Sequence, residues 1–114
     1  MFTSYGHLTQ AEDIAPNSVV IIPLAAMESH GPHLPLSTDG IIVEGLLERA
    51  AEFDTTEAPI YCLPTLWLGA SMEHGKCAGT LSIEPELLIA QIISIGEGLA
   101  SKGVSRVVLF NAHG

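Results

Sequence analysis

The chain has 114 residues, a length that suits one domain rather than two. Its 13 acidic and 4 basic residues give a formal net charge of -9, which repels phosphate backbones and disfavours a nucleic-acid-binding face. Apolar residues make up 47% of the chain and the mean hydropathy is +0.40, so we expect exposed apolar surface that a further segment or other subunits cover.

The first half of the chain predicts one strand followed by one helix. Residues 1–17 are expected to form an irregular or partly helical lead-in. Ser18 to Leu24 is a run rich in β-branched residues, which is typical of a strand buried on both faces of a parallel sheet. After a stretch rich in glycine and proline, a helix is expected from Ile41 to Glu52, with Asp39 or Thr38 as its cap. The residues expected on one side of this helix are Ile42, Leu46 and Ala50.

The second half predicts a strand, a loop, a helix and a last strand. Ile60 to Leu63 is a second short strand, and residues 66–80 form a glycine-containing loop. A helix begins near Pro85, at a position that tolerates proline, and ends before Gly103. Arg106 to Phe110 is expected to be a third buried strand. The apolar stripe of the second helix consists of Leu88, Ile92, Ile95 and Leu99.

This alternation of strands and helices predicts an open α/β sheet. Connections through helices make the strands parallel, and ligands of such sheets bind beyond the carboxyl ends of the strands. The chain ends at Gly114, just after the third strand, before any helix that could cover it. We therefore expect residues 1–114 to be a single domain that forms the N-terminal part of a longer one.

Polar side chains follow the first and third predicted strands. Glu28 and His30 are two residues apart, which places both on one face of an extended segment. Asp39 comes after a loop stiffened by prolines, and His113 follows the third strand. In a parallel sheet these side chains meet at one edge. Their oxygen and nitrogen atoms suit zinc or manganese, and the absence of a suitable cysteine pair disfavours a thiolate site.

Each of these residues also has a purely structural interpretation. Asp39 could only cap the following helix, and His30 or His33 could only form hydrogen bonds within the loop. His113 could be an ordinary residue at a strand end. Glu28 is harder to explain in this way, because an unpaired buried carboxylate is costly. Together the structural interpretations require four coincidences at one sheet edge.

The loop at residues 66–80 contains a second polar cluster. His74 is a candidate for proton transfer or substrate contact, and could equally be a solvated loop histidine. Glu73 is interpreted as its solvated neighbour. Trp67 could pack under the loop or line a pocket. Nothing marks Cys77 as a nucleophile, and the chain has neither a GxGxxG motif nor a P-loop for nucleotides.

The cellular compartment of the protein is inferred from its cysteines and its N-terminus. Cys62 and Cys77 do not make a disulfide framework, which favours a reducing environment. The N-terminus lacks a signal-peptide pattern, and no apolar stretch approaches the roughly 18 residues that a membrane span needs. We expect a cytoplasmic protein without membrane contact.

Three motifs resemble the creatininase (creatinine amidohydrolase) family, in the right order along nearly the whole chain. The first is Glu28-Ser29-His30-Gly31-Pro32-His33-Leu34-Pro35 followed by Asp39. The second is Gly69-Ala70-Ser71-Met72-Glu73-His74 with Gly79-Thr80, and the third is Asn111-Ala112-His113-Gly114. One departure is Ala25, where the family usually has glycine.

The resemblance implies a three-layer α/β/α sandwich with a mainly parallel sheet, of which this chain is an incomplete part, and a homo-oligomer that is a hexamer in several members. It implies two divalent ions per site, zinc or manganese. Glu28, Asp39 and His113 would hold the first ion. His30 and Asp39 would hold the second, with a further glutamate ligand beyond Gly114.

The resulting hypothesis is a metal-dependent amidohydrolase, acting on a small, possibly cyclic substrate. It would cleave amide-type C–N bonds other than ordinary peptide bonds. Two cations would activate a water that attacks a carbonyl or amidine carbon, with Glu28 and His74 as catalytic residues. One alternative is a non-catalytic metal-binding or assembly fragment that keeps Glu28, His30 and Asp39. Another is a nucleotide-binding α/β domain, which the missing phosphate loop disfavours.

Overall fold

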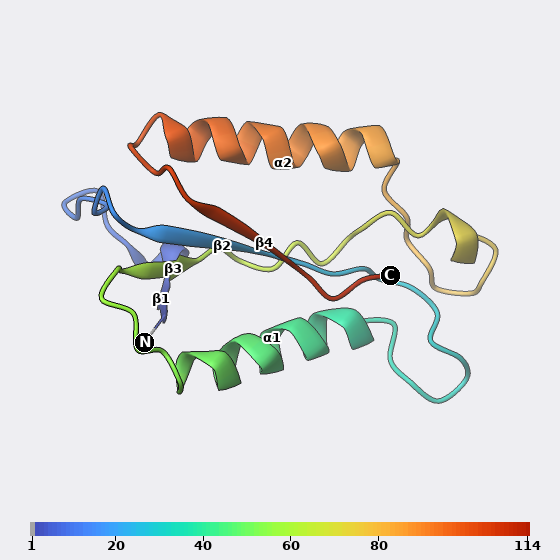
Figure 1. The fold of residues 1–114 in the computed structure, drawn as a ribbon. Helices are drawn as coiled ribbons and strands as arrows, with labels where there is room; N and C mark the ends of the chain where they lie inside the picture. The colour runs from blue at the N-terminus through green and yellow to red at the C-terminus, as the bar shows by residue number, and fades with distance from the viewer. Residues whose placement is uncertain (1) are drawn as a thin grey trace.

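The computed structural model describes residues 2–114 and shows a four-stranded parallel sheet with an α-helix on each face (Figure 1). The order of the strands across the sheet is β1-β3-β2-β4. The predicted α/β architecture, with a parallel sheet between two helical layers, is confirmed. In chain order the elements are β1 (Phe2–Ser4), the 3-10 helix η1 (Tyr5–His7), β2 (Val19–Leu24), α1 (Thr38–Ala51), β3 (Ile60–Cys62), the 3-10 helix η2 (Met72–His74), α2 (Pro85–Ala100) and β4 (Val107–Asn111).

The inner strand β2 carries the core on both of its faces. Val20 and Ile22 are fully buried in a cluster with Leu99 of α2. Between them in the sequence, Ile21 points to the opposite face and packs in a cluster with Val43 of α1. Successive side chains of a strand alternate between faces, so a strand covered on both sides needs an uninterrupted apolar run. This explains the composition of the segment.

The N-terminal lead-in contains a strand that the sequence did not predict. β1 pairs in parallel with β3, with Phe2 opposite Ile60 and Ser4 opposite Cys62. The expected irregular or partly helical lead-in is therefore wrong for these residues, although the short helix η1 follows directly. A strand of three residues shows no repeat of apolar positions, and only its pairing with β3 defines it.

Helix α1 begins earlier than expected. Its first residue is Thr38 rather than Ile41, so Asp39 lies within the first turn and is not the cap. The N-cap position belongs to Ser37, which makes no side-chain capping bond. The carboxylate of Asp39 is buried and turned toward histidine side chains instead. The prediction that Asp39 or Thr38 caps this helix is wrong, because both residues lie within its first turn and the Thr38 hydroxyl donates to the carbonyl of Pro35.

Helix α1 also buries a different side from the one expected. Val43 and Leu47 are buried, whereas Ile42 and Leu46 are 46% and 51% exposed, and Ala50 is exposed as well. Residues spaced by four lie on one helical face, so Asp39, Val43 and Leu47 point the same way. The orientation that packs this helix on the sheet is therefore the one that presents Asp39 to the strand ends.

Helix α2 follows the prediction closely. The expected stripe is its less exposed side, with Leu99 buried and Leu88, Ile92 and Ile95 partly buried. Gly103, with a φ of +87°, turns the chain toward β4 just beyond the helix. Among residues 2–114, no helix combines the length and apolar character needed to cross a membrane.

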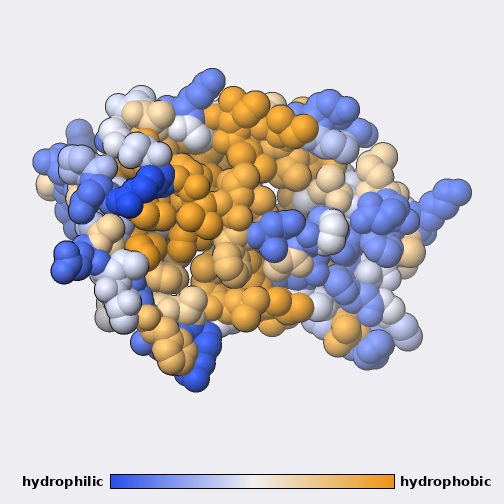
Figure 2. Space-filling view, in the orientation of Figure 1, coloured by the Kyte–Doolittle hydropathy of each residue, from blue (hydrophilic) through white to orange (hydrophobic). Residues whose placement is uncertain are grey.

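Strand β4 is an edge strand and is not buried as expected. It pairs only with β2, and Val107, Val108 and Leu109 are 41%, 42% and 50% exposed. Figure 2 shows apolar residues gathered over this part of the molecule, between the two helices. The prediction of burial failed because it was made from the apolar run alone, and no described residue covers the outer edge of β4.

The first turn of α1 packs closely against Trp67. Gly40 is buried, and a Cβ atom added there would lie 1.9 Å from the ring atom Cζ3 of Trp67. Trp67 thus packs against the helix that carries Asp39, and not only under its own loop. This contact requires a glycine next to Asp39.

Replacing Gly40 by alanine is expected to lower the free energy of unfolding by about 1–3 kcal/mol, because the new methyl group must displace the indole ring or the helix. Gly45→Ala in the same helix is the matched control, since its Cβ would meet no atom within 4 Å. Removing that glycine should instead raise stability by up to about 1 kcal/mol. Urea unfolding of both variants checks this; shifts of equal sign and size would contradict the packing account.

Candidate metal centre

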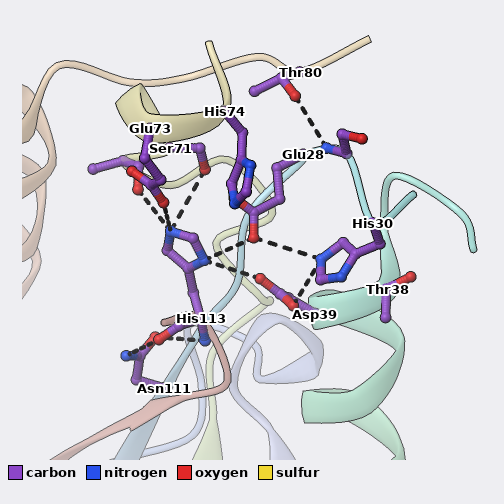
Figure 3. A network of polar contacts seen from close by, with 12 residues as sticks. Glu28, His30, Thr38, Asp39, Ser71, Glu73, His74, Thr80, Asn111 and His113 are labelled. Carbon is purple, nitrogen blue, oxygen red and sulfur yellow. Dashed lines mark hydrogen bonds and ion pairs between the residues drawn. The ribbon is translucent and has the colours of Figure 1, made fainter. Parts of the chain in front are cut away.

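Three segments distant in sequence bring polar side chains to one edge of the sheet (Figure 3). Glu28 and His30 follow β2, Asp39 lies in the first turn of α1, and His113 follows β4. Strands β2 and β4 are parallel neighbours, so their carboxyl ends lie side by side. The convergence of these four residues, predicted from the sequence, is present in the structure.

The four side chains alternate carboxylates with imidazoles. Asp39 Oδ1 lies 3.1 Å from His30 Nε2, and Asp39 Oδ2 lies 3.0 Å from His113 Nδ1. Glu28 Oε1 lies 3.1 Å from His113 Nδ1 and 3.5 Å from His30 Nε2. Glu28 and Asp39 are each only 4% exposed. Two carboxylates therefore share the same two imidazoles in a nearly water-free position.

The backbone holds the segment from Glu28 to His30 in place. The N–H of Glu28 donates to the carbonyl of Leu36 at 3.0 Å, and the N–H of Ser29 donates to Oγ1 of Thr80 at 3.0 Å. Gly31, with a φ of +80°, then turns the chain away, a conformation that favours glycine. The contact with Thr80 ties this segment to the loop at residues 66–80. Glu28 and His30 thus face one side, as their spacing predicts.

The orientation of His113 is set by backbone and amide groups. Its Nε2 lies 2.6 Å from the carbonyl oxygen of Ala70, an acceptor, so Nε2 carries the proton of the neutral ring. Nδ1 faces Glu28 and Asp39, and when it carries a proton it donates to Asp39 Oδ2 at 3.0 Å. Asn111 Oδ1 accepts from the backbone N–H of His113 at 3.1 Å, and Asn111 Nδ2 donates to its carbonyl at 2.7 Å. Such outer contacts are typical of histidines that bind metal.

The surroundings of His113 favour positive charge at its ring. Burial alone lowers the pKa of His113, but the hydrogen bonds to Ala70 and Asp39 and the negative charges of Glu28 and Asp39 outweigh it, so the pKa is raised. A proton and a metal ion compete for the same lone pair on Nδ1. The site therefore attracts whichever cation is available to it.

Two buried atoms test whether these residues fit a metal ion. Glu28 Oε2 and His30 Nε2 are buried and have no hydrogen-bond partner among the described residues. His30 Nε2 is near Asp39 Oδ1, yet the pair is not aligned for a hydrogen bond. Lone pairs that face each other without a shared proton suit a common cation. Single ligand atoms of Glu28, Asp39 and His113 all lie within 4.8 Å of one another, so the set fits a divalent ion.

Helix η2 places two more polar side chains beside this cluster. His74 Nε2 lies 4.0 Å from Glu28 Oε2, and Glu73 Oε1 lies 4.0 Å from His113 Nε2. Their side chains are 44% and 59% exposed, so they border the open side of the site. Glu73 is solvated as expected, but its carboxylate also belongs to the cluster, which the sequence interpretation missed.

Other residues considered from the sequence lie outside the cluster. His33 and Cys77 are exposed. Cys62 is partly buried in β3, and burial raises the pKa of its thiol, as suits a packing residue. The carbonyl of Ala70 and the amide of Asn111 were not predicted to orient His113. A backbone carbonyl carries no sequence signal, whereas an asparagine two residues before a histidine is a weak one.

Comparisons with known proteins agree on one family. The sequence model for creatininase, described as creatinine amidohydrolase, matches residues 7–114. A mycofactocin precursor peptide peptidase of Mycobacterium tuberculosis is 34% identical over 115 residues, covering 96% of this chain and 45% of the relative. A creatinine amidohydrolase of Pseudomonas putida is 27% identical over 109 residues, covering 91% and 40%. The chain spans less than half the length of these relatives.

A solved structure agrees with the fold. A structure described as creatininase Mn superimposes with a TM-score of 0.85 at 27% sequence identity, covering 99% of this chain and 46% of that chain. The described sheet and helices therefore correspond to slightly less than half of a creatininase chain.

Zn²⁺ is expected to stabilise this chain, because it binds the folded site and not the unfolded chain. At a concentration of 100 times the Kd, the free energy of unfolding should rise by about 2.7 kcal/mol. Asp39→Asn, which keeps the shape and removes the charge, should abolish most of this gain. Asp13→Asn, at an exposed carboxylate, is the control. Denaturant unfolding with and without Zn²⁺ measures both, and equal stabilisation of the two variants would count against the site.

Proposed function

Because the chain belongs to the creatininase family, we propose that it forms the metal-binding part of a hydrolase that cleaves an amide-type C–N bond. The supporting observation is the approach of the two oxygens of Asp39 to two different imidazoles, those of His30 and His113. The chain covers 45% of the peptidase relative, so the activity is proposed for a protein of that greater length.

Asp39 is proposed as the ligand common to two ions. Its Oδ1 faces His30 and its Oδ2 faces His113, so each oxygen can serve a separate ion. Glu28 would complete the set on the side of His113. Donors of this kind suit zinc or manganese. When bound, such ions make water a nucleophile near neutral pH and polarise the carbonyl group of a substrate.

His74 is proposed to transfer a proton during the reaction. It lies on the open side of the cluster, where a substrate can approach, and its Nε2 is 4.0 Å from Glu28 Oε2. A general acid or base must reach the reacting group directly or through one water, and His74 would meet this requirement for a substrate bound over Glu28. Glu28 is proposed to stabilise the positive charge that His74 carries when its ring is protonated.

The charge of the metal-free site is negative. Glu28, Asp39 and Glu73 place three carboxylates around it, and their ion pairs among residues 2–114 are with histidines rather than with lysine or arginine. Two divalent ions would outweigh these three negative charges, so the carboxylates favour the binding of cations and do not by themselves select a substrate. One relative is named for a precursor peptide and another for creatinine. These names give no support to the expectation from the sequence that the substrate bond is not an ordinary peptide bond.

The proposal is tested on the natural gene product that contains this chain, with a small cyclic amide and a peptide amide as substrates. His74→Ala should lower kcat by about 10²–10⁴ while the ions held by Asp39 stay bound. Asp39→Asn should lose both activity and ions, and Asp13→Asn should change neither. Steady-state kinetics and metal analysis give the readouts.

Two results would contradict this account. Full activity in Asp39→Asn would remove the metal site from the reaction. Bound ions without hydrolysis of any amide would favour the alternative of a non-catalytic metal-binding or assembly module, which uses the same ligands.

A further inference from the structure

Glu28 directs its two carboxylate oxygens to different neighbours. Oε1 lies near His113 Nδ1 and His30 Nε2, and so belongs to the group around Asp39. Oε2 is buried and has no hydrogen-bond partner among residues 2–114. Burying a carboxylate oxygen without a hydrogen-bond partner costs free energy. A positive charge beside Oε2 would offset this cost, as at Oε1. The side chain that faces Oε2 is His74, whose Nε2 lies 4.0 Å away.

Glu73 joins Glu28 and His74 around this second oxygen. One ligand atom from each of the three residues lies within 4.8 Å of the other two, and Figure 3 shows His74 beside the Glu28 carboxylate with Glu73 nearby. No ion pair with lysine or arginine involves Glu28 or Glu73 in the part of the chain that the structure describes. Two carboxylates and one imidazole thus face each other without a fixed cation.

The turn that carries Glu73 and His74 is well anchored. Ser71, fully buried, precedes both residues, and its N–H donates to Oγ of Ser82 at 2.8 Å. The N–H of His74 donates to the carbonyl of Ser71 at 3.0 Å. Both ligands are therefore presented from a short helical turn whose start is fixed in the core.

From this geometry we infer a further cation position, formed by Glu28 Oε2, Glu73 and His74, that binds a divalent ion separately from the group around Asp39. Two carboxylates and an imidazole are donors that suit Zn²⁺ or Mn²⁺. Glu73 and His74 are about half exposed, so water completes the coordination and the affinity is lower than at the buried Asp39 group.

Occupation of this position has a consequence for the proposed reaction. The Nε2 lone pair of His74 cannot hold an ion and accept a proton at the same time. An ion bound there therefore opposes proton transfer by His74, so that excess divalent cation inhibits the enzyme. This consequence rests on the proposed function, whereas binding of the ion does not.

Zn²⁺ binding to this chain, measured by calorimetry and by equilibrium dialysis with metal analysis, tests the inference. The unchanged chain should show a tight class of ions and one weaker ion. Glu73→Gln should lower the affinity for the weakly bound ion at least tenfold. The affinity of the tight class should stay within twofold of its original value. His74→Gln should do the same. Glu57→Gln, at an exposed glutamate away from the site, is the matched control and should change neither class.

The outcomes separate this inference from the proposed function. Retention of the tight class shows that Glu73→Gln is folded, so an unchanged weaker ion in that variant would overturn the inference. Loss of the weaker ion in Asp39→Asn but not in Glu73→Gln would assign that ion to the Asp39 group and also overturn it. Absence of the tight class from the unchanged chain would instead contradict the metal site on which the proposed function depends.

Discussion

Two buried carboxylates, Glu28 and Asp39, converge on a single imidazole nitrogen of His113. Each lies about as far from that nitrogen as a hydrogen-bond partner would, at 3.1 and 3.0 Å. The opposite nitrogen of the ring donates to Ala70, so Nδ1 is the position at which the ring can take up either a proton, which it donates to Asp39, or a metal ion. Like charges held together in a low-dielectric position require a compensating cation. This requirement is the physical basis for the metal ions that we propose at the site.

The fold is arranged so that this convergence follows from ordinary packing. Strand β2 runs between β3 and β4, and its parallel pairing with β4 places the residues after both strands at one edge. The face of α1 that packs on the sheet through Val43 and Leu47 also carries Asp39. The contact between Gly40 and Trp67 fixes the first turn of the same helix. Core packing and site geometry therefore depend on the same few contacts.

The sequence was most informative where several residues report one feature. The apolar run ending at Leu24 indicated an inner strand, and the spacing of Glu28 and His30 indicated a shared face beyond it. The rule that parallel strands share their carboxyl edge then brought Asp39 and His113 to the same place. These steps needed only local patterns and a general topology rule.

The features that sequence reasoning missed depend on tertiary contacts. The three residues of β1 are too few to show an alternation of apolar and polar positions. They form a strand because they pair with the free edge of β3. Helix α1 has apolar residues on more than one side, so composition alone did not identify its buried face. The apolar sequence of β4 predicts a buried strand even though this strand lies at an edge of the sheet. The carbonyl of Ala70 orients the ring of His113. Every residue has a backbone carbonyl, so the sequence does not mark this one.

A crystal structure obtained with Zn²⁺, with anomalous diffraction recorded at the zinc edge, tests the central claim most directly. The account predicts an anomalous peak about 2.0–2.2 Å from an oxygen of Asp39 and from Nδ1 of His113, with Nε2 of His113 still donating to Ala70. Zinc bound only elsewhere, with the hydrogen bond between Asp39 and His113 of the metal-free structure retained, would contradict it.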